Sequence, residues 1–164
     1  MVPVQLSVPL TSTKKPIRRD TALTMSDNLE IVREIYFEPL PLDPDLLTGL
    51  AEIATPDTLF DFTDAYPDGP VVKGVDGVRR ISTTWPWKAL HFAPERFLDV
   101  DGQRVLVFVR ATATGMGSGV PVERRTAHEC TFSDGSLVRF KVYSDRAVAL
   151  DAAGLSDRAA TLLR

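Results

Sequence analysis

The sequence contains a single cysteine, Cys130, and only two histidines, His91 and His128, among its 164 residues. One thiol cannot form an intrachain disulfide or a thiolate metal site, and the spacing of the two histidines matches no zinc signature. No acidic cluster has the spacing of a calcium loop. We therefore expect no metal and no cofactor, and the scarcity of cysteine favours a cytoplasmic protein.

Positive charge and long apolar runs are also scarce. Lys and Arg number 19 against 22 Asp and Glu, a formal net charge of −3, which leaves no cationic field suited to nucleic acid. No apolar run reaches the roughly 18 residues that span a bilayer, and no segment repeats with a period of about 20–50 residues. We expect neither nucleic acid nor a membrane as a partner.

The remaining composition is that of one globular domain, with 44% hydrophobic and 25% charged residues. Residues 1–24 differ from the rest, because they hold three prolines and many hydroxyl side chains but no periodic apolar face. Their apolar part is interrupted, which argues against a secretory signal. We predict a loosely attached tail over 1–24, a domain over 25–155 and a C-terminal tail over 156–164.

Helical spacing dominates the first half of the chain and strand spacing the second. Apolar residues recur at intervals of three and four from Ser26, over 46–53 and from Val75 to Trp85. After residue 95 the pattern is that of strands, which we place at 96–100, 104–114, 120–132 and 137–143. The expected fold class is α+β, with N-terminal helices packed on an antiparallel sheet.

The loop of the final hairpin decides which side chains share a face of that sheet. A two-residue loop over 134–135 would mix charged and apolar residues, whereas a three-residue loop over 133–135 separates them and sets Glu129 opposite Arg139. We predict the three-residue loop. It leaves His128 as the only strongly polar residue on an inward face. The other residues of that face are Cys130, Phe132, Val138, Phe140 and Val142.

A buried imidazole needs a hydrogen-bond partner. Tyr36 is the best candidate, because a tyrosine on the apolar face of the first helix buries its ring while its hydroxyl still seeks a partner. The pair forms either the polar focus of a small-molecule pocket or a satisfied contact within a filled core. The sequence leaves both interpretations open.

Two carboxylates, Asp61 and Asp64, lie beside aromatic residues, so one of them is a candidate general base at the pocket rim. The alternative for both is a solvated position. The two tryptophans are candidate pocket walls, or else core or oligomer contacts. The residues expected to line the pocket are Phe60, Phe62, Trp85, Trp87, Cys130, Phe140 and Val142.

Four segments of the chain, in this order and spacing, resemble the SnoaL-like proteins of the nuclear transport factor 2-like superfamily, which includes ketosteroid isomerases and polyketide cyclases. They are VREIY in the first helix, VVKGVDGVRRI, AHECTFSDGSLVRF and DRAVALDAAGL. The resemblance covers residues 27–155. It implies a cone of helices over a strongly curved mixed or antiparallel sheet, an internal pocket, and a homodimer through the outer sheet face.

The resemblance also implies a mechanism. Tyr36 falls on the tyrosine position of the ketosteroid isomerase oxyanion hole, His128 on that of a strand aspartate, and Asp64 near the aspartate that moves the proton. We expect a cofactor-independent isomerase or cyclase, in which Tyr36 and His128 polarise the oxygen of a hydrophobic carbonyl compound and Asp64 is the base. The alternative is a non-catalytic dimeric ligand-binding or scaffold module. The outer face of that module would bear Glu129, Arg139 and Tyr143.

Overall fold

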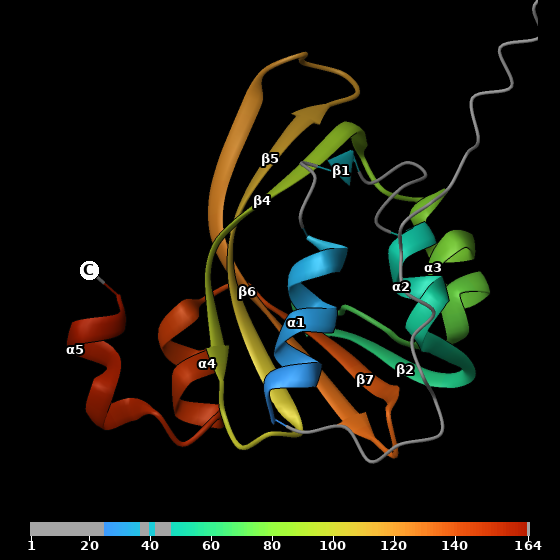
Figure 1. Cartoon of the computed structure of the whole chain (residues 1–164). Coiled ribbons are helices and arrows are strands. Elements are labelled where there is room, and N and C mark those ends of the chain that lie inside the picture. Colours follow the sequence, from blue (N-terminus) through green and yellow to red (C-terminus); the bar gives the residue numbers. More distant parts are fainter. Residues whose placement is uncertain (1–24, 37–39, 42–46, 164) are drawn as a thin grey trace, which may run out of the picture.

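A computed structural model describes residues 25–36, 40–41 and 47–163 of the chain (Figure 1). The predicted tail over 1–24 lies outside the described residues. The helices are α1 (Met25–Ile35), α2 (Leu47–Ile53), α3 (Gly74–Ser82), α4 (Arg146–Ala152) and α5 (Ala159–Leu162), with a short 3-10 turn, η2 (Ser156–Arg158). The strands are β1 (Leu40–Pro41), β2 (Ala54–Asp64), β3 (Val71–Lys73), β4 (Trp87–Asp99), β5 (Arg104–Gly115), β6 (Pro121–Ser133) and β7 (Ser136–Tyr143).

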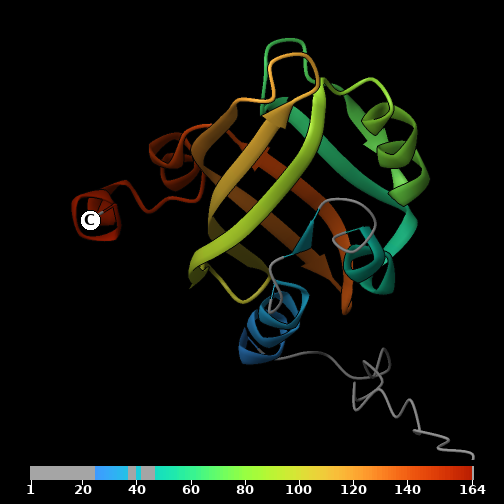
Figure 2. The same ribbon diagram turned by 90° about the horizontal axis from the view of Figure 1, so that it is seen from above.

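The strands form one sheet in the order β1-β4-β5-β6-β7-β2-β3. Strand β2 runs parallel to β7, and the other neighbours are antiparallel. The sheet curls strongly, with α1, α2 and α3 on its inner side and α4 and α5 on its outer side (Figures 1 and 2). The predicted α+β cone is therefore confirmed.

Two features of the sheet differ from the sequence prediction. Strand β4 begins at Trp87 rather than at residue 96, because its first half pairs with β5 although Lys88, His91 and Pro94 interrupt its apolar pattern. Strand β2 follows α2 directly in the chain, and its parallel pairing with β7 joins segments about 80 residues apart. Local periodicity contains no signal for such a long-range pair.

Strands β6 and β7 join through a two-residue turn, so the predicted three-residue loop is wrong. Asp134 and Gly135 both have positive φ, 49° and 77°, as a type I′ turn requires. A β-bulge then leaves Val138 without a partner residue in β6 and shifts the register by one residue. Val138 is 40% exposed, so its predicted place on the inward face is also wrong.

For the residues after Val138, the turn and the bulge together preserve the predicted faces but change the direct partners. His128 lies opposite Val142, so the grouping of the imidazole with apolar residues is confirmed. Glu129 lies opposite Lys141 rather than Arg139, so the predicted cross-strand pair is wrong. The face that a residue occupies depends only on whether the strand register shifts by an odd or an even number of residues, whereas its partner depends on the exact shift.

The C-terminal segment covers part of the outer sheet face. Tyr143 packs there in a second apolar cluster with residues of α4 and α5, among them Leu150 and Leu162. Asp145 caps the N-terminus of α4, and its carboxylate accepts hydrogen bonds from the backbone N–H groups of Ala147 and Val148. Glu129 and Tyr143 are only 4% and 3% exposed, so the prediction that they present a partner-binding surface is wrong. No helix among the described residues combines the length and apolar character needed to cross a bilayer.

Candidate functional site

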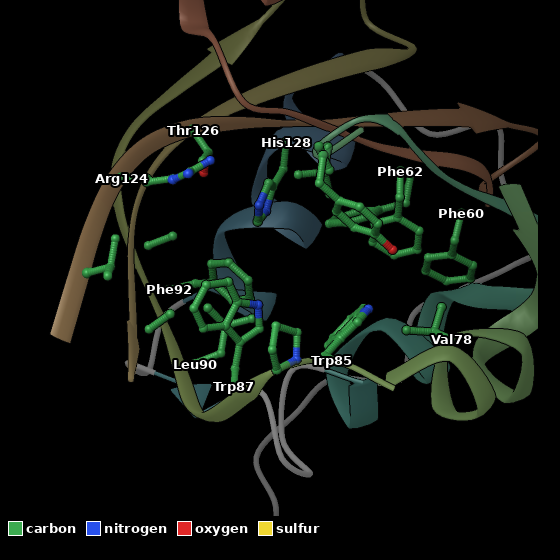
Figure 3. A pocket seen from close by; sticks show the side chains of 18 of the residues that line it. Phe60, Phe62, Val78, Trp85, Trp87, Leu90, Phe92, Arg124, Thr126 and His128 are labelled. Atoms are coloured by element: carbon green, nitrogen blue, oxygen red, sulfur yellow. The ribbon is translucent and has the colours of Figure 1, made fainter. Parts of the chain in front are cut away.

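A cavity of about 380 Å³ lies between the inner face of the sheet and helices α2 and α3 (Figure 3). Leu50 of α2 and Val78 of α3 contribute to its wall. Its lining is mostly apolar, which suits a hydrophobic small molecule. Six of the predicted lining residues line it, namely Phe60, Phe62, Trp85, Trp87, Phe140 and Val142.

Cys130, the seventh predicted lining residue, does not line the cavity. It shares a face with His128 but lies two residues further along β6, within the packed core, where it is 0% exposed. Burial, with a smaller contribution from Glu129, raises the pKa of its thiol. Strand alternation predicts which side of a sheet a residue faces but not how far along the strand the cavity extends.

Tyr36 and His128 meet as predicted. The Tyr36 hydroxyl lies 2.6 Å from His128 Nδ1, and both residues are almost fully buried. This is the only hydrogen bond of that hydroxyl within the described residues. Because a phenol O–H is a stronger donor than a neutral imidazole N–H, and an imidazole nitrogen a stronger acceptor than a phenol oxygen, we assign the hydroxyl as donor and Nδ1 as acceptor. Burial lowers the pKa of His128 to about 3, so its imidazole is neutral at pH 7 and carries its proton on Nε2.

That Nε2–H group is a donor without a partner. It forms no hydrogen bond within the described residues, and Figure 3 shows the His128 ring projecting into the cavity. The rings of Phe92 and Phe140 pack edge-on against it, with centroids 5.0 and 5.2 Å from its own. An N–H held this firmly in apolar surroundings binds a carbonyl oxygen more strongly than it would in water.

Tyr36 does not itself line the cavity, because it lies behind His128. The prediction that the Tyr36 hydroxyl contacts the ligand oxygen is therefore wrong, and that for His128 stays a prediction. The Tyr36 hydroxyl instead contacts Nδ1 of His128, and with the hydroxyl as donor the imidazole proton lies on Nε2. Burial, and to a lesser degree Cys130, raises the pKa of Tyr36, so it remains a neutral donor.

Neither candidate base reaches the cavity. Between Asp61 and Asp64, strand β2 uses three residues where β7 uses two, and this bulge turns Asp64 away from the side that Phe62 faces. The carboxylate of Asp64 lies 2.7 Å from Lys141 Nζ on the outer side of the sheet, and its side chain is 46% exposed. The prediction of Asp64 as the catalytic base is therefore wrong.

The carboxylate of Asp61 also lies on the outer side of the sheet. It pairs with Arg139 and accepts two hydrogen bonds from Thr63. Burial alone would raise the pKa of Asp61, but the bonds from Thr63 and Arg139 and the nearby charge of Lys141 lower it to about 2. A carboxylate with such a low pKa is a weak base, so Asp61 does not replace Asp64 in that role.

The Asp64→Asn variant is expected to bind hydrophobic ligands as the wild type does, with an affinity change below about twofold. The substitution removes only a partly exposed ion pair outside the cavity, which contributes about 0.2–1 kcal/mol to stability. Fluorescence titration with benzophenone, read from the pocket tryptophans, measures this. A loss of tenfold or more would show that Asp64 influences the cavity after all.

Sequence reasoning missed two polar residues of the cavity, Arg124 and Thr126. Both lie on β6 at even spacing from His128, and the alternation of that strand could have placed them on the same face. None of the described residues that line the cavity is an Asp or Glu. The described residues also contain no group of three or more His, Cys, Asp or Glu side chains able to hold a metal ion.

The sequence matches one protein-family model, the SnoaL-like domain, over residues 42–140, which is more than half of the chain. None of the curated proteins matches it at a significant level.

Solved structures with the same fold include a nuclear transport factor 2-like protein of Burkholderia pseudomallei K96243. It is 23% identical, with a TM-score of 0.58 over 76% of this chain and 95% of its own. A protein of Jannaschia sp. CCS1, named as a SnoaL-like polyketide cyclase, is 20% identical, with a TM-score of 0.60 over 84% and 96% of the two chains. SalBIII, an epoxide hydrolase/cyclase-like enzyme of pyran ring formation in salinomycin, is 17% identical, with a TM-score of 0.53 over 71% and 88%.

Proposed function

Because the chain belongs to the SnoaL-like family, we propose that its cavity binds a hydrophobic carbonyl compound whose oxygen accepts a hydrogen bond from His128 Nε2. The observation that carries this proposal is the buried Nε2 of His128, which has no hydrogen-bond partner among the described residues although His128 lines an apolar cavity of about 380 Å³. A ligand carbonyl satisfies this donor, which otherwise costs free energy in a buried site. The surrounding aromatic rings suit a flat, ring-containing compound.

The chemistry that this arrangement supports is carbonyl activation without a cofactor. A neutral imidazole donor stabilises the negative charge that develops on the oxygen when a nucleophilic carbon attacks the carbonyl carbon. No described lining residue carries a carboxylate, so the attacking carbon must be acidic enough to lose its proton to water, as a carbon between two carbonyl groups is. The C–C bond then forms as the C=O π bond opens, and the resulting alkoxide takes a proton back from water. Intramolecular ring closure fits this requirement better than isomerisation of a simple ketone.

The second candidate is a ligand-binding protein without catalysis. The same lack of a lining carboxylate favours it, because binding needs a donor and an apolar wall but no base. A scaffold with a filled interior is less favoured, since the tryptophans border a cavity instead of filling it. The homodimer through the outer sheet face and the cytoplasmic location stay predictions.

Benzophenone labelled with carbon-13 at its carbonyl tests the proposed hydrogen bond. We expect its C=O stretch to lie at lower frequency in the wild-type complex than in complex with the His128→Phe variant, because donation from Nε2 weakens the C=O bond. The variant should bind benzophenone up to about tenfold more weakly. Infrared difference spectra and a fluorescence titration measure the two effects.

Two controls separate the hydrogen bond from changes in packing. Diphenylmethane has a similar shape but no oxygen, so its affinity should be similar in both proteins. Tyr36→Phe keeps the imidazole but frees its tautomer, so the C=O stretch should lie between those of wild type and His128→Phe. Equal frequencies in all three complexes would overturn the proposed role of His128.

A further inference from the structure

Three polar side chains of strand β6 line the cavity. Arg124, Thr126 and His128 alternate along β6 and all line the cavity, and Figure 3 shows them along the same wall. Four residues of strand separate the Cα atoms of Arg124 and His128 by about 13 Å. The two nitrogen-rich side chains therefore lie at two separate positions of an otherwise apolar surface.

Arg124 is the only charged residue among the described residues that line the cavity. It forms no ion pair or hydrogen bond with any described residue, and its side chain is exposed. Its cross-strand neighbour in β5 is Ala111, and Ala113 follows on the same face. These small side chains leave room beside the guanidinium, which a bulkier residue would fill.

Arg124 and His128 together present two kinds of donor. Arg124 offers a permanent positive charge with forked N–H groups that match a carboxylate, whereas His128 offers one neutral N–H. A ligand carboxylate bound at the exposed Arg124 side chain would keep partial contact with water and gain charge-assisted hydrogen bonds from the guanidinium group. A carbonyl oxygen is the better match for the buried imidazole, because bringing an anion there would cost more desolvation.

We propose that the ligand is a hydrophobic oxo acid, bound with its carbonyl oxygen at His128 and its carboxylate at Arg124. This inference rests on the proposed function and adds the chemical class and orientation of the ligand. Two polar anchors joined by an apolar body fix which way the molecule lies in the cavity. The orientation places the reacting carbonyl at the inner end and the charged group near solvent.

The test compares 4-benzoylbenzoate with 4-benzoylbenzamide, which have nearly the same shape but differ in charge. In the wild type we expect the acid to bind about tenfold more tightly than the amide at low ionic strength. Arg124→Gln should reduce this preference to less than about twofold and leave the affinity for the amide nearly unchanged. Isothermal titration calorimetry at low and high salt measures both.

Arg125→Gln is the matched control. It removes the same charge from the adjacent residue, which lies on the outer side of the sheet. The pKa of Glu95 on that side is lowered mainly by the hydrogen bond from Arg146, against the opposing effect of burial, and the nearby charge of Arg125 lowers it further. The tenfold preference should persist in this variant. Loss of the preference in both variants would mean that net charge, and not Arg124, attracts the acid, and would overturn the inference.

The remaining outcomes separate the inference from the proposed function. Equal binding of acid and amide to the wild type, with both weakened by His128→Phe, overturns only the role of Arg124. No binding of either probe to the wild type overturns the proposed function and the inference with it. As a check on location, Ala111→Phe should weaken both probes by tenfold or more, because its ring occupies the space beside Arg124.

Discussion

Between pH 6.5 and pH 5, the free energy of unfolding is expected to fall by about 2 kcal/mol because of His128 alone. Burial lowers the pKa of this imidazole from 6.5 to about 3 in the folded protein. Below pH 6.5 the unfolded chain therefore binds a proton that the folded protein does not. The contribution of His128 to the free energy of unfolding is therefore largest above pH 6.5. It falls by about 1.4 kcal/mol per pH unit as the pH decreases toward 3.

The His128→Gln variant isolates this effect, because glutamine does not titrate. Its free energy of unfolding should change much less over the same pH range, whatever its stability at pH 7. The lowered pKa values of Asp61, Glu95 and Asp101 start from ordinary values of 3.8, 4.5 and 3.8, so those carboxylates contribute at lower pH. Urea unfolding at several pH values gives both slopes. Parallel slopes for wild type and variant would contradict a buried neutral imidazole.

The Gly69→Ala variant is expected to lose about 3 kcal/mol of folding free energy. A Cβ atom at this position would lie 1.8 Å from the backbone oxygen of Phe62 and 2.6 Å from its carbonyl carbon. The backbone there cannot retreat easily, because the Phe62 N–H donates to Pro70 and the Gly69 N–H donates to Tyr66. The same turn supplies Tyr66 to the cavity wall, so ligand affinity should fall as well.

Gly117→Ala is the control for this substitution. A Cβ atom at Gly117 meets no other heavy atom within 4 Å, so its effect should stay within about 0.5 kcal/mol. Thermal or urea unfolding of the two variants measures the difference. Similar stabilities for Gly69→Ala and Gly117→Ala would show that the turn rearranges at little cost.

Periodic patterns predicted most of the elements that build the cavity. The spacing of apolar residues in α1 indicated that Tyr36, which directly follows the helix, is buried on its covered side, and the alternation in β6 placed His128 on the inner face of the sheet. The cost of an unpartnered buried imidazole then indicated that the two side chains meet. Their 2.6 Å contact confirms this reasoning.

A bulge caused the error that matters most for the site. The bulge in β2 moves Asp64 to the outer side of the sheet, whereas in β7 the two-residue turn exposes Val138 and the bulge that follows restores the predicted faces of the later residues. An inserted residue reverses the face of every later residue in the strand, and nothing in the spacing of either strand marks the insertion. Simple alternation from Phe62 would place Asp64 on the cavity side, and the bulge removes it from there.

The sequence by itself determined the α+β class, the inner face of β6 and the pairing of a tyrosine with a histidine, because each depends on a local period or on the chemistry of one side chain. Only the tertiary structure decided that β2 lies parallel to β7, that no described carboxylate lines the cavity, and that Arg124 does. Those outcomes depend on the exact register of strands far apart in the chain. Register is decided by the summed packing of the whole sheet and not by any short segment of it.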